Sequence, residues 1–166
     1  MVSKILNGLA RTTILKITDT VFAAKYSVGG ITSDQIVEFA DNQLSEGIYS
    51  DHYLEIVTEN NSYPELIKRN LELAFAEIGI EIPSVDNAIW ELLHYHFNIM
   101  AFLNIDRIKQ FGLLLDDMKE IELNEKTIKY YGIDCIYRVY SDSSIRCNLA
   151  MRIESQNWLK KYDKKD

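Results

Sequence analysis

Apolar residues recur through most of the chain at spacings of three and four positions, the pattern of amphipathic α-helices. Residues 32–45 show it most clearly, because Thr32 and Gln35 form a capping-box pattern and the apolar residues that follow share one helical face. Gly47 is expected to end this helix, since glycine readily adopts the left-handed conformation found after helix C-termini.

Further helices are expected over about residues 51–59, 64–78, 84–103 and 106–118. The short helix at 51–59 is predicted to bury three side chains, Tyr53, Leu54 and Val57. Ser62 and Glu65 form a second capping-box pattern, with Pro64 in the first turn of the helix that follows. Gly79 is expected to cap the end of that helix.

Residues 127–153 allow two interpretations. Apolar and polar residues alternate from Ile145 to Ile153, and with the preceding CIYRVY run and an SDSS turn they would form a β-hairpin. We favour a helix, because LAMR is a strong helix-forming run and SDSS is good N-capping chemistry. That helix would carry two apolar stripes, one of Ile145, Leu149 and Ile153 and the other of Cys147, Met151 and Trp158. The second stripe would lie among neighbouring helices or face a partner.

These patterns predict a mainly α fold, a single domain over residues 1–166 built as a bundle of about six to eight helices. A small β-hairpin near the C-terminus is the one strand element that the pattern allows. The 7 glycines and 2 prolines are too few for a turn-rich all-β fold. No apolar run reaches the roughly 18 residues of a membrane span, and the N-terminal residues lack the apolar core of a signal peptide. We therefore expect a cytoplasmic protein with no membrane association, whose two cysteines are free thiols.

The stretch AIWELLHYHFNIM, residues 88–100, contains the strongest candidate for a metal site. Glu91 and His94 have the Glu-x-x-His spacing of helical metal sites, whereas His96 falls on the apolar face and is expected in the core. His94 is expected at the surface. A di-iron carboxylate bundle needs a second Glu-x-x-His and further inward glutamates, which the sequence lacks. We expect no metal and no cofactor. The chain also contains no G-x-S-x-G and no Walker motif, so we do not expect an enzyme.

Charge is distributed unevenly along the chain, whose net charge is −7. Residues 34–125 carry 19 acidic and 5 basic side chains, while both ends are mildly basic. This excess of negative charge opposes long-range attraction to phosphate, so nucleic acid is not an expected partner.

The carboxylates gather in three groups that form the predicted partner-binding surface. They are Asp34, Glu38 and Asp41; Asp51, Glu55 and Glu59; and Asp116, Asp117 and Glu120. Like charges one helical turn apart repel each other, and carboxylates near a helix C-terminus meet the negative end of the helix dipole. Such a local cost suggests a function, namely a negative surface for a basic partner. The competing interpretation is that these groups are only solvated faces.

Small size, acidic charge, a helical body and the lack of a catalytic motif together resemble the immunity proteins of bacterial toxin–immunity pairs, especially those of contact-dependent growth-inhibition systems. The resemblance is one of type and brings no family residues with it. It implies binding of a cognate toxin, often a basic nuclease, and blockage of its active or substrate-binding site. Two alternatives stay open. One is a helical adaptor or structural protein, and the other is a metal-binding helical enzyme that uses Glu91 and His94. The oligomeric state is open.

We predict that the purified protein carries no stoichiometric metal, because one Glu-x-x-His offers fewer ligands than zinc or di-iron sites need. Elemental analysis by mass spectrometry should find far less than one zinc or iron per chain. A full equivalent of either metal that disappears in His94→Ala would contradict this prediction.

Overall fold

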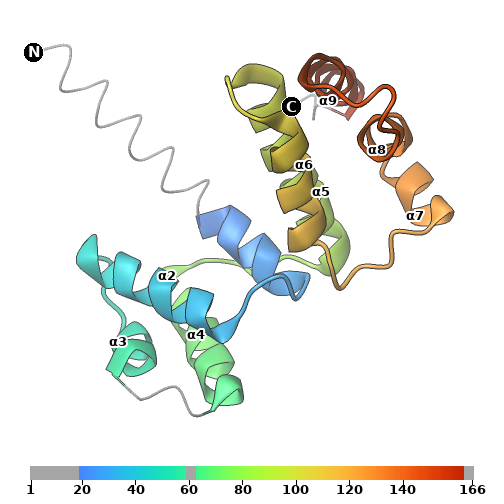
Figure 1. Cartoon of the computed structure of the whole chain (residues 1–166). Helices are drawn as coiled ribbons and strands as arrows, with labels where there is room; N and C mark the ends of the chain where they lie inside the picture. The colour runs from blue at the N-terminus through green and yellow to red at the C-terminus, as the bar shows by residue number, and fades with distance from the viewer. Residues whose placement is uncertain (1–18, 59–62, 163–166) are drawn as a thin grey trace, which may run out of the picture. The chain divides into compact units, whose positions relative to one another are not determined.

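A computed structural model describes residues 19–58 and 63–162 of the chain. All regular secondary structure in these two ranges is helical, which confirms the mainly α prediction (Figure 1). The helices group into two compact units. The described part of unit 1 comprises residues 19–27 and 31–84, and that of unit 2 comprises residues 28–30 and 85–162. The single domain expected from chain length stays a prediction, and each unit is described by itself.

Unit 1 contains a helical segment at residues 19–27 followed by α2 (Ser33–Ser45), α3 (Asp51–Thr58) and α4 (Pro64–Ile78). The capping box of α2 is confirmed. The Gln35 backbone N–H donates to Thr32 Oγ1, and the Thr32 backbone N–H donates to Gln35 Oε1 at 2.8 Å. Gly47, with φ of 84°, follows the end of α2 as expected. Local sequence therefore determines both ends of α2.

At the start of α4 the structure corrects the expected capping box. The N-cap residue is Tyr63, whose side chain makes no capping hydrogen bond, while Ser62 lies outside the described residues. Pro64 occupies the first turn, where its missing N–H costs nothing. Gly79 ends α4 in the left-handed conformation, as predicted, and its N–H donates to the Phe75 carbonyl.

Aromatic rings form the centre of the unit 1 core. Phe22 stacks on Phe39 with 3.8 Å between ring centroids, and Phe75 meets Phe39 edge-on at 5.9 Å. Tyr53 of α3 also meets Phe39 edge-on. Such pairs add about 0.5–1.5 kcal/mol each beyond the area that they bury. The core thus holds the 19–27 segment, α2, α3 and α4 together.

The buried face of α3 differs from the prediction. Tyr53 and Ile56 are buried, whereas Leu54 and Val57 are exposed. Neighbouring residues of a helix point about 100° apart, so Tyr53 and Leu54 are both buried only where packed neighbours cover a wide arc of the helix. The prediction is confirmed for Tyr53 and wrong for Leu54 and Val57, because the apolar residues of α3 extend around more of the helix than its neighbours cover.

Unit 2 contains α5 (Val85–Phe102), α6 (Arg107–Asp117), α7 (Glu125–Tyr130), α8 (Asp134–Ser141) and α9 (Asn148–Tyr162). The alternative of a C-terminal β-hairpin is wrong, since CIYRVY lies within α8 and the alternating segment opens α9. Asp142 stabilises the turn between them by accepting hydrogen bonds from the Ser144 backbone N–H and hydroxyl. The helix is favoured because it buries the side that carries Met151 and Trp158 against α5.

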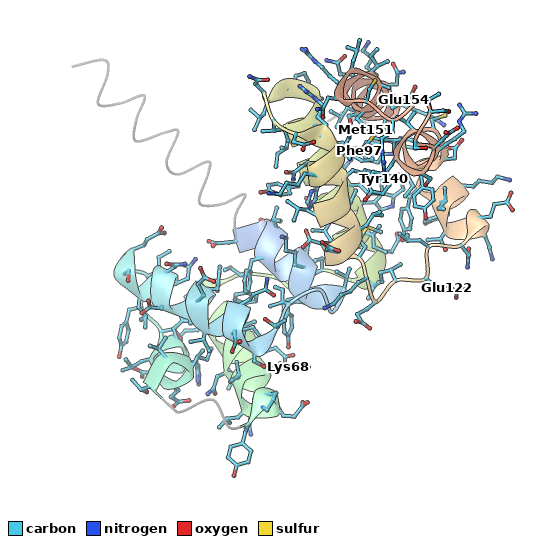
Figure 2. The ribbon with its side chains drawn as sticks, in the orientation of Figure 1. Lys68, Phe97, Glu122, Tyr140, Met151 and Glu154 are labelled. Carbon is cyan, nitrogen blue, oxygen red and sulfur yellow. The ribbon has the colours of Figure 1, made fainter. Side chains whose placement is uncertain are left out.

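The inner side of α9 is one of the two predicted stripes. Met151 and Trp158 are buried, and Figure 2 labels Met151 together with Phe97 of α5, both fully enclosed. The rings of Trp158 and Phe97 meet edge-on at 4.6 Å. Cys147 lies outside this contact and is exposed. Of the two alternatives given for this stripe, the one among neighbouring helices is therefore confirmed for Met151 and Trp158, and the stripe of Ile145, Leu149 and Ile153 is the exposed one.

The end of α9 fits against a glycine. Gly132 has φ of 65°, and a Cβ atom there would overlap the ring of Tyr162. The Trp158 indole N–H donates to the Tyr131 carbonyl at 2.9 Å, one residue earlier in the same turn. These contacts attach the last turns of α9 to the connection between α7 and α8.

None of the helices among the described residues is both long and apolar enough to cross a membrane.

One side of the unit 1 core contains polar atoms without hydrogen-bond partners. Gln43 Nε2 donates to Asp19 Oδ1 at 2.9 Å, but Gln43 Oε1 and Tyr53 Oη are buried and unpaired among the described residues. Burial raises the pKa of the Asp19 carboxyl above its usual value, although the hydrogen bond from Gln43 opposes this shift. A neutral side chain that both donates and accepts would suit position 19 better than a carboxylate does.

We predict that Asp19→Asn stabilises unit 1 near neutral pH by up to about 1 kcal/mol, because asparagine keeps the acceptor for Gln43 Nε2 and adds a donor for Gln43 Oε1. The folded-state pKa of Asp19 is raised, so the wild type gains stability as pH falls through that pKa and the advantage of asparagine should shrink. Urea unfolding at several pH values measures both effects. Glu38→Gln, which neutralises an exposed carboxylate of α2, is the control. A destabilised variant, or a difference that does not change with pH, would contradict the assignment.

Candidate protein-interaction surfaces

The Glu-x-x-His pair does not gather a ligand set. His94 is half-buried and packs edge-on against Trp158 of α9, with 4.9 Å between ring centroids. It therefore does not point freely to solvent, which differs from the surface position expected from the sequence. Among the described residues, no group of three or more His, Cys, Asp or Glu could hold a metal ion. Zinc needs at least three protein ligands, so Glu91 and His94 alone make a poor site.

His96 is buried as predicted, and both of its ring nitrogens have partners. Nε2 lies 2.9 Å from Asp117 Oδ2, and Nδ1 lies 2.9 Å from the Gln110 side-chain nitrogen. When the Gln110 amide donates to Nδ1, Nε2 carries the proton and donates to Asp117. Neither nitrogen is then available to a substrate or a metal. The arrangement fixes α6 against α5 and supplies no general base.

Asp117 therefore does not belong to the exposed acidic surface predicted from the sequence. Its side chain is only 13% exposed and faces His96, while Asp116 and Glu120 remain exposed. The Asp117 backbone carbonyl also lies where a Cβ atom at Gly30 would be, so only glycine fits there. Within the third acidic group, two of the three predicted residues can meet a partner.

The carboxylates of α2 form an open stripe. Asp34, Glu38 and Asp41 are all exposed and recur at one-turn spacing on the side opposite the core. The last turn of α2 contains no basic residue to offset them. The three predicted residues thus lie together on one solvent-facing side of a single helix.

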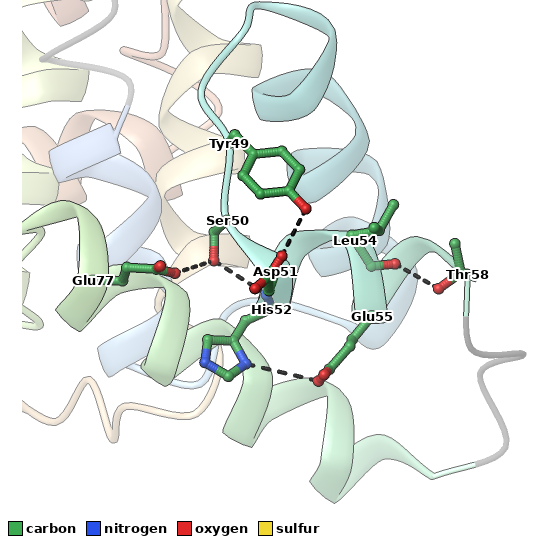
Figure 3. A network of polar contacts seen from close by, with 8 residues as sticks. All are labelled: Tyr49, Ser50, Asp51, His52, Leu54, Glu55, Thr58 and Glu77. Atoms are coloured by element: carbon green, nitrogen blue, oxygen red, sulfur yellow. Dashed lines mark hydrogen bonds and ion pairs between the residues drawn. The ribbon is translucent and has the colours of Figure 1, made fainter.

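The carboxylates of α3 are held by local contacts (Figure 3). The Tyr49 hydroxyl donates to Asp51 Oδ1 at 2.6 Å, which raises the pKa of Tyr49. Glu55 Oε2 lies 3.7 Å from His52 Nδ1. Both carboxylates are exposed, while Glu59, the third member of the predicted group, lies outside the described residues. Asp51 and Glu55 therefore face solvent in restrained positions.

Buried Ser50 anchors this same segment. Its hydroxyl donates to Glu77 Oε2 of α4 at 2.6 Å and accepts from the His52 backbone N–H at the start of α3. One side chain thus caps α3 and ties it to α4. The acidic residues of α3 are consequently presented on a fixed support.

Exposed apolar side chains lie beside these acidic residues, and sequence reasoning missed them. Leu54 and Val57 are 43% and 36% exposed, and Tyr49 is 64% exposed. The sequence pattern assigned Leu54 and Val57 to the core. Apolar residues within a ring of charges are typical of the centre of protein–protein interfaces.

The two units differ in charge. The described residues of unit 1 contain eleven acidic and three basic side chains, whereas those of unit 2 contain eleven acidic and ten basic. The net negative charge of the described chain therefore comes almost entirely from unit 1, where the first two predicted groups lie. Asp116 and Glu120 belong to unit 2.

We predict that Asp117→Ala costs about 1–3 kcal/mol of unfolding free energy, because it removes the partner of a buried imidazole. Asp116→Ala, one residue earlier in the same turn and exposed, should change the stability by less than about 0.5 kcal/mol. Chemical denaturation of both variants measures the difference. Equal effects of the two substitutions would show that the His96 contact contributes nothing.

Comparisons with known proteins add no family to this description. No protein-family model matches the chain, and no curated protein or solved structure matches it.

Proposed function

We propose that this chain is an acidic protein-binding inhibitor, an immunity protein that binds and neutralises a cognate basic toxin in the cytoplasm. The supporting observation is the exposed acidic surface of unit 1, on α2 and α3. Its members are Asp34, Glu38, Asp41, Asp51 and Glu55. Among the described residues of unit 1, only three basic side chains stand against eleven acidic ones. Partner binding gives a reason for keeping such a surface.

The chemistry of the proposed partner follows from the sign of the charge. A toxin that cleaves RNA or DNA must be cationic to hold a phosphate backbone. A surface of carboxylates can occupy the same cationic site and thereby block substrate binding. Opposite charges also speed association, which matters for an inhibitor that must act before its toxin does.

The centre of the proposed interface is on α3. Leu54 and Val57 would bury apolar area against the toxin, with Asp51 and Glu55 at the rim. Buried apolar anchors supply most of the binding energy in interfaces of this kind, and rim charges act mainly on the association rate. The contacts of Ser50 and Tyr49 keep these residues in place before binding, which reduces the entropy lost on association.

A helical adaptor or structural protein remains the second candidate, because an exposed acidic helix face also increases solubility. A metal-binding enzyme that uses Glu91 and His94 gains no support, since no third ligand joins them among the described residues. A toxin gene immediately upstream of the gene for this chain would favour the inhibitor over the adaptor. Its toxin domain would then serve as the binding partner in the following test.

We predict that Glu38→Lys and Glu55→Lys together lower the association rate constant for the cognate toxin domain about tenfold at low salt, because steering by opposite charge is lost. Rising ionic strength should remove most of the difference, since it screens the charges. Stopped-flow association kinetics measure the rate, and survival of cells that express the toxin measures protection. Glu122→Lys, an equally exposed reversal in unit 2, is the matched control and should change neither.

If all exposed carboxylates of α2 and α3 can be reversed without loss of affinity, the electrostatic proposal is wrong. The solvated-face interpretation predicts that outcome, together with a small gain in melting temperature from relieved repulsion. Measuring affinity and melting temperature on the same variants distinguishes the two interpretations.

A further inference from the structure

The solvent-facing side of α9 carries apolar and basic residues but no carboxylate. Leu149 and Ile153, one turn apart, are 65% and 45% exposed. Arg152 and Lys160 are exposed on the same side of the helix. The one carboxylate of α9, Glu154, is half-buried. The pKa of the Cys135 thiol on α8 is raised by burial first and then by the nearby charges of Asp134 and Glu154. The charge of this face is opposite to that of the acidic surface on α2 and α3.

The end of α5 extends this apolar area. Phe102 and Leu103 are 68% and 52% exposed. The Ala101 carbonyl, next to them in the chain, accepts hydrogen bonds from Arg152 Nε at 3.2 Å and from the Gln156 amide at 3.4 Å. These contacts place the α5 terminus directly beside the exposed side of α9.

A depression of about 290 Å³ lies between the two helices. It is lined by Asn98, Phe102, Gln156, Leu159 and Lys160. Phe102 and Leu159 supply apolar walls, and the Lys160 ammonium can pair with a carboxylate. The Asn98 and Gln156 amides donate to the His94 and Ala101 carbonyls and form the polar part of the lining. A ligand that suits this lining combines an aliphatic side chain with a negative charge.

We propose that this depression and the exposed side of α9 form a docking site for an acidic amphipathic helix of a partner protein. Aliphatic residues of that helix, one turn apart, would pack on Phe102 and Ile153, and its flanking carboxylates would meet Arg152 and Lys160. This is the helix-in-groove mode of recognition. Charge complementarity selects an acidic helix, because no carboxylate on the exposed side of α9 would favour a basic one.

An anionic lipid surface is disfavoured as the occupant. Interfacial helices bury a continuous apolar face several ångströms into the bilayer. The broad apolar side of α9 is already used inside unit 2, where Met151 and Trp158 are buried. What remains outside is a small apolar area with cations around it, which matches a helix of similar width.

A displayed library of helical peptides tests the proposal. Each peptide carries two leucines one turn apart, and every flanking position is free to be Glu or Lys. Selection on the whole protein should enrich Glu at the flanking positions. Enrichment of Lys, no enrichment, or no recovered binder would overturn the proposal.

Two exposed residues of the site then locate the binding. Phe102→Ala and Lys160→Glu should each weaken binding of a selected peptide about tenfold, as expected for an anchor and a paired charge. Leu73→Ala on α4 and Lys126→Glu on α7 are matched exposed controls and should bind like the wild type. Circular dichroism checks that each variant is folded. Equal binding by all four variants would overturn the proposal.

Two further measurements separate other occupants. Sedimentation of the protein with phosphatidylserine vesicles that is lost in Lys160→Glu would assign the face to lipid instead. Analytical ultracentrifugation that shows a concentration-dependent dimer lost in Phe102→Ala would assign it to a second copy of the chain. Either result would overturn the proposal, and neither bears on the acidic surface of unit 1.

Discussion

A buried imidazole must satisfy both of its ring nitrogens, and that requirement governs how unit 2 is built. His96 lies on the inner side of α5, so its partners must come from the helix that packs there. Gln110 and Asp117, two turns apart on one face of α6, each bond one ring nitrogen of His96. Together they fix the rotation of α6 about its axis and its position along that axis relative to α5. Gly30 then has to be a glycine, because the carbonyl of the fixed Asp117 leaves no room for a side chain.

The distribution of charge follows a different logic from the packing. The described residues of unit 2 nearly balance their charges, while those of unit 1 carry a large negative excess around an aromatic core. The α2 carboxylates Asp34, Glu38 and Asp41 lie on the side opposite that core and take no part in its packing. The apolar residues left outside differ in the same way, since those on α3 stand among carboxylates and those on α9 among cations. One short chain thus exposes apolar residues in two surroundings of opposite charge.

Helix positions were predictable from the sequence where the determining contacts are local, as with Thr32 and Gln35, which cap α2 from three residues apart. The inward face of α3 was not, because Leu54 and Tyr53 are equally apolar and only the neighbouring helices decide between them. The role of Asp117 was also hidden. Sequence spacing shows a carboxylate near a helix end, but its partner is 21 positions away. For α9, helix-forming residues predicted the helix, but its two apolar stripes did not reveal which one is inside.

The contact between Gly132 and Tyr162 has an evolutionary consequence. Backbone conformation and the overlying ring both exclude a side chain at position 132, so a larger residue there would require a smaller one at position 162 and a rebuilt turn. The constraint acts in one direction, because a smaller residue at position 162 would clash with nothing at Gly132, 30 residues away. In any set of descendants of this chain, position 132 should therefore stay glycine while position 162 varies, which makes the glycine the better marker of common ancestry.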